Sequence, residues 1–136
     1  MSEDARSTSE ASVRFELDSD RGFVRIHVRG RFPMSEAQQR QAEVAAAYPG
    51  VNRFWDMSEA DLSDWTGRDI RGGIEAVASR TPPPAGEGMR VAALVSRDID
   101  YGVARMWEAM AAGSLAIVYA VFRDEERAIE WLSTGK

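Results

Sequence analysis

The segment from Met89 to Leu132 decides the fold, and it reads MRVAALVSRDIDYGVARMWEAMAAGSLAIVYAVFRDEERAIEWL. Two runs in it, 90–95 and 115–122, are apolar almost throughout. Such runs are typical of strands whose two faces are both covered by helices. The stretch between them has helical periodicity, so the segment predicts a strand, a crossover helix, a parallel strand and a final helix.

The crossover helix is predicted to begin after Ser96 or Asp98, because either side chain can cap it. Its apolar positions recur at helical spacing and are expected to face the core: Ile99, Val103, Met106, Trp107 and Met110. Methionine and tryptophan at this spacing are more often core than ligand site, but they and Tyr101 also suit the wall of an apolar cleft. The final helix is expected to be capped by Asp124.

A β-hairpin with one polar face is predicted near the N-terminus, because apolar and charged residues alternate on both sides of the loop 19–22. Pairing across this loop sets Leu17 opposite Val24 and Glu16 opposite Arg25. His27, the only histidine, falls on the polar face between two arginines, and we expect it to be a solvated surface residue.

Two helices and a short strand are predicted in the middle of the chain. A capping box of Ser35 and Gln38 predicts the start of the first helix, which ends before the Pro49-Gly50 pair. Residues 53–57 suit a short strand followed by a polar loop, 58–64.

The next helix is predicted to begin at Thr66, with Asp69 at the second capping position. Its expected buried stripe is Ile70, Ile74, Val77 and Ala78. The adjacent Gly72 and Gly73 indicate either close packing against a neighbour or a mobile turn. The proline-rich segment 80–88 predicts an exposed connection.

Composition bounds the class of protein. The 136 residues suit one domain, which we place at 13–136 after a flexible tail, 1–12. The net charge of -5 disfavours nucleic acid and anionic membrane as partners. There is no cysteine, no secretory signal pattern and no apolar run near the ~18 residues that span a bilayer, so we expect a cytoplasmic protein without an integral membrane segment.

No catalytic constellation is evident. A serine hydrolase would need His27 as its base, far from any elbow-like serine, and no glycine pattern for a phosphate follows a strand. One set of acidic residues suits a divalent cation, but capping and solvation explain it equally well: Asp56, Glu59, Asp61, Asp64 and Asp69. We therefore predict a protein that is not an enzyme and has no cofactor or metal.

The element order and the motifs 95–98, 101–106 and 121–125 resemble the STAS-like superfamily typified by anti-sigma factor antagonists. The similarity is greater to small bacterial SpoIIAA-like proteins, often labelled STAS/SEC14. It implies an α/β fold with a mixed five-stranded sheet and four helices, in the order β-β-α-β-α-β-α-β-α.

In phosphorylatable STAS antagonists, an aspartate at the end of the third strand is followed eight residues later by Asp-Ser-x-Gly. Here Asp56 is followed by Asp64-Trp65-Thr66-Gly67, so Trp65 stands where the phosphoacceptor serine is expected. Control by phosphorylation at that position is chemically excluded. Thr66 has a hydroxyl, but the sequence does not decide whether it is phosphorylated.

The resemblance and the missing catalytic residues predict a binding or regulatory module that acts through the end of the third strand and the starts of the two following helices. The alternative is a carrier or sensor of a small apolar, lipid-like ligand. A homodimer through an exposed Trp65 or the hairpin edge is a further expectation. The residues predicted to form the partner or ligand face are Asp56, Ser58, Asp64, Trp65, Thr66, Tyr101, Met106 and Trp107.

Overall fold

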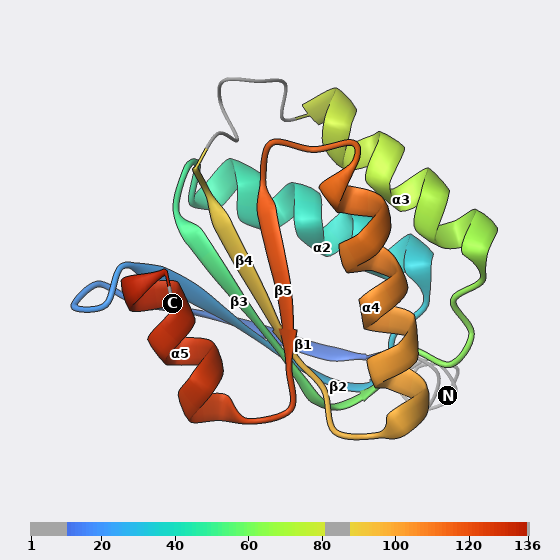
Figure 1. The fold of residues 1–136 in the computed structure, drawn as a ribbon, viewed down its shortest axis with the longest axis horizontal. Coiled ribbons are helices and arrows are strands. Elements are labelled where there is room, and N and C mark those ends of the chain that lie inside the picture. Colours follow the sequence, from blue (N-terminus) through green and yellow to red (C-terminus); the bar gives the residue numbers. More distant parts are fainter. Residues whose placement is uncertain (1–10, 81–87, 136) are drawn as a thin grey trace, which may run out of the picture.

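The computed structural model describes residues 11–80 and 88–135 (Figure 1). In this part of the chain it contains the predicted mixed five-stranded sheet and four helices in the predicted order. The strands are β1 (Ser12–Asp18), β2 (Phe23–Arg31), β3 (Asn52–Asp61), β4 (Arg90–Leu94) and β5 (Val118–Phe122). The helices are α2 (Met34–Ala47), α3 (Gly67–Arg80), α4 (Asp98–Ala112) and α5 (Glu125–Thr134). Residues 1–10 of the predicted tail and most of the proline-rich connection lie outside the described residues, and Ser12, the last residue of the predicted tail, begins β1.

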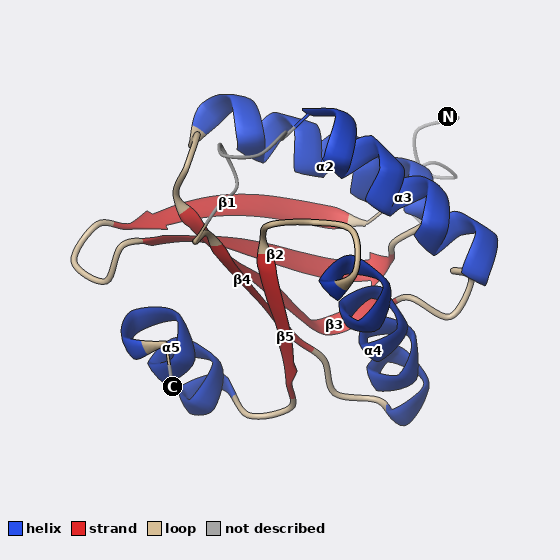
Figure 2. Ribbon diagram, turned by 45° about the horizontal axis from the view of Figure 1, so that its top comes forward, coloured by secondary structure: helices blue, strands red, loops and turns tan. Residues whose placement is uncertain are grey.

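The strands lie in the sheet in their chain order, β1-β2-β3-β4-β5, with β1 antiparallel and the others parallel. Helices α2, α3 and α4 therefore all return over one face, and α5 packs on the other (Figure 2). The larger hydrophobic core lies under α2–α4. A smaller one under α5 contains Phe23, Phe54, Ala92, Leu94, Ala128 and Leu132.

The predicted hairpin register is confirmed, with Leu17 opposite Val24 and Glu16 opposite Arg25. The even-numbered residues of β2 up to Val28 face the larger core and are fully buried, while the odd-numbered Arg25 and His27 face the α5 side. Alternation of side chains across the pleat explains why this register could be read from the sequence.

Strand β3 is longer than predicted, and the prediction of a polar loop over 58–64 is wrong in its first half. β3 continues to Asp61 because β2 also continues, pairing Arg29 with Glu59 and Arg31 with Asp61. The register shifts between His27 and Arg29, where β3 holds one extra residue. Because of the extra residue, Ala60 again faces the core and is buried. The buried positions of β3 therefore do not follow a two-residue period, and the sequence pattern did not indicate the second half of the strand.

The starts of α2 and α3 differ in how well the sequence predicted them. In α2 the N-cap is Pro33 and no side chain caps the helix, so the predicted capping box at Ser35 is wrong. In α3 the capping box is confirmed: the Thr66 amide donates to Asp69 Oδ2 (3.0 Å) and the Asp69 amide donates to Thr66 Oγ1 (3.1 Å). The α3 stripe is buried except for Ala78, which is exposed.

Helix α4 is rotated relative to the prediction. Its N-cap is Arg97, without a side-chain cap, and its buried residues are Asp100, Ala104, Trp107 and Ala111. Ile99 and Met106, expected in the core, are 54% and 43% exposed. Trp107 is buried as predicted, and Val103 and Met110 pack against the core half-buried. The buried row contains an aspartate and two alanines, so hydrophobicity placed the buried face only partly correctly.

The last strand and the last helix complete the fold. β5 begins at Val118, later than predicted, and lies at the edge of the sheet with partly exposed residues, so its expected full burial is wrong. The cap of α5 is confirmed, because Asp124 Oδ1 accepts a hydrogen bond from the Glu126 amide at 3.0 Å.

Candidate functional site

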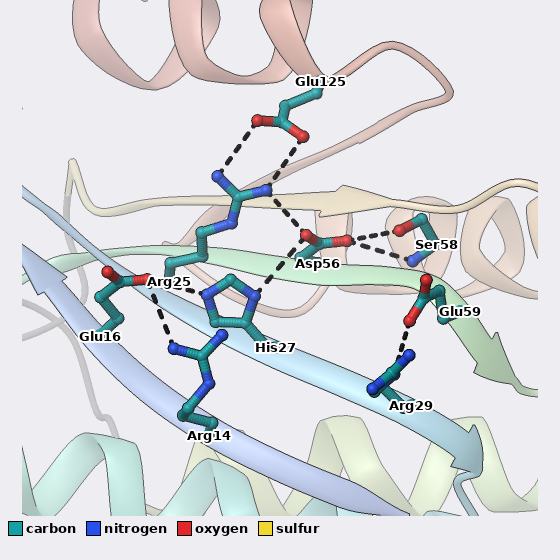
Figure 3. Close-up of polar contacts among 9 residues, drawn as sticks. All are labelled: Arg14, Glu16, Arg25, His27, Arg29, Asp56, Ser58, Glu59 and Glu125. Atoms are coloured by element: carbon teal, nitrogen blue, oxygen red, sulfur yellow. Dashed lines mark hydrogen bonds and ion pairs between the residues drawn. The ribbon is translucent and has the colours of Figure 1, made fainter.

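The sheet separates the residues predicted to form one site. Asp56 and Ser58 lie on the α5 side, in the polar group of Figure 3. Trp65 and Trp107 lie on the opposite face, in the larger hydrophobic core. The structure thus presents three separate features: a polar sheet face, an aromatic layer under the helices, and an apolar groove between α3 and α4.

The polar sheet face is organised by Arg25 of β2 (Figure 3). Its guanidinium binds Asp56 of β3 (2.8 Å) and Glu125 at the start of α5 (3.0 Å), and it lies over the Phe54 ring at 4.7 Å. The face is left open beyond the N-terminus of α5, so Arg25 joins that helix to the sheet. Neither Arg25 nor Glu125 was predicted as a site residue, although the alternation of β2 already placed Arg25 on this face.

Asp56 is held ionised by its neighbours. Burial alone raises the pKa of Asp56, but the hydrogen bonds from Arg25 and from both the hydroxyl and amide of Ser58 outweigh it, and the net pKa is lowered. The carboxylate is therefore a fixed acceptor and is unsuited to general acid catalysis near neutral pH.

His27 is half-buried, with 24% of its side chain exposed, so the prediction of a solvated histidine is wrong. Its Nε2 lies 3.0 Å from Glu16 Oε1 and its Nδ1 lies 3.9 Å from Asp56 Oδ2. It borders a hollow of about 370 Å³ lined by Ser12, Arg14, His27, Val28, Arg29, Asp56, Ser58 and Glu59. The charged groups here pair with one another, as Arg29 does with Glu59 (Figure 3).

The aromatic layer fills the space between the sheet and α2–α4. Its rings form a continuous row from Phe32 through Trp65 and Trp107 to Tyr119, with neighbouring centroids 5.9–6.5 Å apart. Trp65 Nε1 donates to the Phe32 carbonyl at 2.7 Å. Trp65 is thus a packing residue, and the expectation that it is exposed for dimerisation is wrong.

A small apolar cavity of about 50 Å³ remains within this layer. Trp55, Trp65, Trp107 and Tyr119 contribute to its walls, together with Gln41 of α2. Of the predicted cleft residues, Trp107 lines it, whereas Tyr101 and Met106 do not. Tyr101 instead lies beneath two guanidinium groups, those of Arg105 and Arg123.

The loop after β3 is tied to α4 by a buried carboxylate. Asp100 is 1% exposed, accepts the Leu62 amide at 2.8 Å and pairs with Arg97 Nε at 2.6 Å. Arg97 also reaches Asp61 at 2.7 Å. Asp64 lies further along the loop, exposed and paired with Arg31. These contacts fix the loop that carries Thr66.

The third feature is an apolar groove between α3 and α4 of about 390 Å³, lined by Arg71, Ile74, Glu75, Ala78, Met110 and Ser114. Met106 continues it toward the start of α3, where its methyl group lies 3.9 Å from the place a side chain on Gly67 would occupy. Ile99 and Met106 are two of the four large hydrophobic side chains that the described residues leave exposed. The row Ile99, Val103, Met106 and Met110 therefore forms an apolar stripe beside the groove.

The described residues lack both a cluster of metal-ligating side chains and a membrane-spanning helix. Residues 11–80 and 88–135 contain no group of three metal-ligating His, Cys, Asp or Glu side chains. No helix in that part of the chain is long and apolar enough to cross a bilayer.

Comparison with known proteins identifies the fold. No family model and no curated protein matches the sequence. Among solved structures, the chain is similar to an uncharacterized protein of the DUF3478 family with a SpoIIAA-like fold from Shewanella loihica PV-4. The TM-score is 0.55 at 17% identity, over 90% of this chain and 93% of the other. The fold is therefore SpoIIAA-like, as the resemblance implied.

Proposed function

We propose that this protein is a non-enzymatic binding module that holds an amphipathic helix of a partner protein in the groove between α3 and α4. The observation that carries the proposal is an apolar row on α4, in which Ile99 and Met106 are exposed while Val103 and Met110 are half-buried against the core. Ile99, Val103, Met106 and Met110 are spaced by four, three and four residues, which is the spacing at which one helix presents a seam to another.

The exposure of Ile99 and Met106 in one apolar row is unusual for a folded domain. Single exposed hydrophobic side chains are ordinary, but Ile99 and Met106 belong to one row that continues into a groove with Ile74 at its floor. Burial of apolar area contributes about 25 cal/mol per Å² removed from water. Methionine side chains adapt to different surfaces, so Met106 and Met110 suit a docking groove.

Charge favours a partner helix with acidic residues beside its apolar stripe. Arg68 and Arg71 are exposed on α3. Within residues 11–80 and 88–135, neither of them forms an ion pair. Arg71 lines the groove, which also has one carboxylate, that of Glu75. An acidic flank would find these guanidinium groups unpaired and would speed association by electrostatic steering.

Phosphorylation at the usual position has no part in this function. Trp65 has no hydroxyl, and its ring is packed against Phe32 and Trp107. The neighbouring Thr66 hydroxyl accepts the Asp69 amide in the capping box. We therefore propose that binding is set by the availability of the partner.

Site-specific photo-crosslinking tests the proposal. A benzophenone amino acid is placed at position 106, or at position 17 as a matched control, because Leu17 is 49% exposed on the hairpin and Met106 is 43% exposed. In cells of the source organism, position 106 is expected to crosslink one protein that position 17 does not. Ile99→Glu in the same chain should remove that crosslink, while circular dichroism shows an unchanged fold.

Three results would contradict the proposal. Crosslinks of the same proteins from both positions would indicate nonspecific contact, and no crosslink from position 106 would indicate a free surface. A crosslink to a second copy of this chain would make the groove a dimer interface.

A carrier of a lipid-like ligand is less well supported. The cavity in the aromatic layer measures about 50 Å³, whereas ligand pockets for drug-sized molecules are about 300–1,000 Å³ and benzene occupies an engineered cavity of about 150 Å³. A lipid-like molecule would require α2 or α4 to move away from the sheet. Native mass spectrometry of gently purified protein distinguishes the two functions, because a carrier shows a reproducible apolar adduct.

A further inference from the structure

Arg53 is a buried cation without a counter-ion. It lies at the start of β3 and points to the side of α2 and α3, where the residue is 8% exposed. Within residues 11–80 and 88–135 its guanidinium forms no hydrogen bond and no ion pair. Its Nε is fully buried without an acceptor, while Nη1 and Nη2 keep some contact with solvent. Every other arginine of β2 and β3 is paired with a carboxylate.

Leaving a guanidinium in this state is costly. Burial of an unpaired charge costs several kcal/mol even after the protein relaxes. Burial lowers the pKa of Arg53, but arginine titrates so far above neutrality that the group stays charged. A buried polar atom without a partner needs an explanation, and one explanation is an anion that binds there.

The surroundings of Arg53 fit an anion. It borders a cavity of about 20 Å³ whose other walls are Gln41, Ala45, Trp55, Val77, Arg80, Val91 and Tyr119, with no carboxylate among them. Burial raises the pKa of Tyr119 to about 12, so its hydroxyl keeps its proton and can donate. Gln41 Oε1 also lacks a partner. A half-turn of that amide presents its N–H groups to an anion instead.

The anion cavity lies beside the cavity in the aromatic layer. The cavities of about 20 Å³ and about 50 Å³ share Gln41, Trp55, Val91 and Tyr119 as walls. The smaller cavity is thus lined by two cations, and the larger one is mostly apolar, with Glu108 and Gln41 as its polar wall residues. Since a water needs about 10–15 Å³ of such space, the two cavities together, about 70 Å³, hold about five to seven heavy atoms.

We propose that Arg53 binds the carboxylate of a short-chain aliphatic monocarboxylic acid, of about three to five carbons, whose hydrocarbon part lies in the aromatic layer. A guanidinium binds a carboxylate through two parallel N–H groups, which suits a single buried arginine. Arg80 adds a second positive charge at the same cavity. The site shares no wall residue with the groove between α3 and α4, so it is independent of the docking function.

Calorimetric titration with butyrate tests the site, with tryptophan fluorescence as a second readout because Trp55 and Trp107 line the cavity. Wild-type protein is expected to bind butyrate saturably and to melt at a higher temperature in its presence. Arg53→Met should weaken binding at least tenfold while the melting temperature without ligand stays equal or rises, because an unpaired buried charge is removed. Arg29→Met, on the exposed opposite side of the sheet, should bind as the wild type does.

Formate and butyramide separate the two halves of the ligand. Formate has the carboxylate without the chain, and butyramide has the chain without the charge, so both are expected to bind more weakly than butyrate. Equal binding of formate would show that the aromatic layer does not take part, and equal binding of butyramide would show that Arg53 does not. Either result, no saturable binding, or unchanged binding by Arg53→Met would overturn the proposal.

Discussion

Gly73 of α3 and Trp107 of α4 are in direct contact, because a methyl group on Gly73 would lie 2.7 Å from the Trp107 ring. The sequence left two explanations for the Gly72-Gly73 pair, close packing or a mobile turn. The structure assigns close packing to Gly73. It leaves open space beside Gly72, where an added methyl group would meet nothing within 4 Å.

Alanine at these two glycines is predicted to have opposite effects on stability. Gly72→Ala should raise the free energy of unfolding by about 0.5–1 kcal/mol, because alanine is the better helix former. Gly73→Ala gains the same propensity, but its methyl group overlaps a ring held by Trp65 and Tyr119 and should lower stability by about 1–3 kcal/mol. Urea denaturation of the two variants checks this, and equal effects would contradict the contact.

Trp65→Ser, which places the serine of phosphorylatable STAS antagonists at position 65, is predicted to lower stability by about 3–5 kcal/mol. The indole contacts Phe32 and Trp107 and donates to the Phe32 carbonyl, so its removal opens a cavity and leaves that carbonyl unpaired. Thermal unfolding measures the loss. Thr66→Ala is the neighbouring control and should cost only about 1 kcal/mol, the value of a helix cap. A stable Trp65→Ser variant would show that this ring is not needed for packing.

Asp100→Ala is predicted to lower stability by about 3 kcal/mol, because it leaves the buried Leu62 amide without an acceptor and Arg97 without its nearest carboxylate. Asp98→Ala is a matched control in the same first turn of α4. The Asp98 side chain contacts Arg123 but is 95% exposed. Urea denaturation compares the two. A loss below about 1 kcal/mol for Asp100→Ala would contradict its role in fixing the loop after β3.

The fold could be predicted from sequence because its strands follow simple periods. The hairpin alternates strictly from Val13 to Val28, which fixed both its register and its buried face. The apolar run of β4 indicated a central strand covered on both sides. The errors arose where a period was interrupted, as at the extra residue in β3, or where a buried row was poor in hydrophobic side chains, as in α4.

The candidate sites were harder to predict, because each depends on contacts between distant segments. Asp56 was selected by its place near the end of the predicted third strand, but its partners Arg25 and Glu125 come from β2 and α5. Arg53 carried no signal, since a charged residue next to an aromatic run usually marks a strand end exposed to water. The exposed stripe of α4 was found as a pattern and assigned to the core, because periodicity shows that a face is apolar and does not show what covers it.

The decrease in the free energy of unfolding at acid pH is predicted to depend on Asp61. Hydrogen bonds from the hydroxyl and amide of Ser63, followed by that of Arg97, lower the pKa of Asp61 from 3.8 to about 2. Because the pKa of Asp61 is lower in the folded protein than in the unfolded chain, the ionised carboxylate stabilises the fold at pH values above the unfolded pKa. This contribution is lost as the pH falls from about 4 to about 2. The side chain is 39% exposed, so solvent screening limits the contribution to about 1 kcal/mol or less.

Asp61→Asn should therefore be slightly less stable than the wild type at pH 6, and the difference should vanish near pH 2. Urea denaturation at pH 6, 4, 3 and 2 measures both curves. Ser63→Ala serves as the matched control, because it removes the largest contribution to the low pKa of Asp61 while keeping the carboxylate and Arg97. It should shift the acid loss to higher pH. If Asp61→Asn and the wild type differ equally at every pH, Asp61 has no lowered pKa and Ser63 does not act through it.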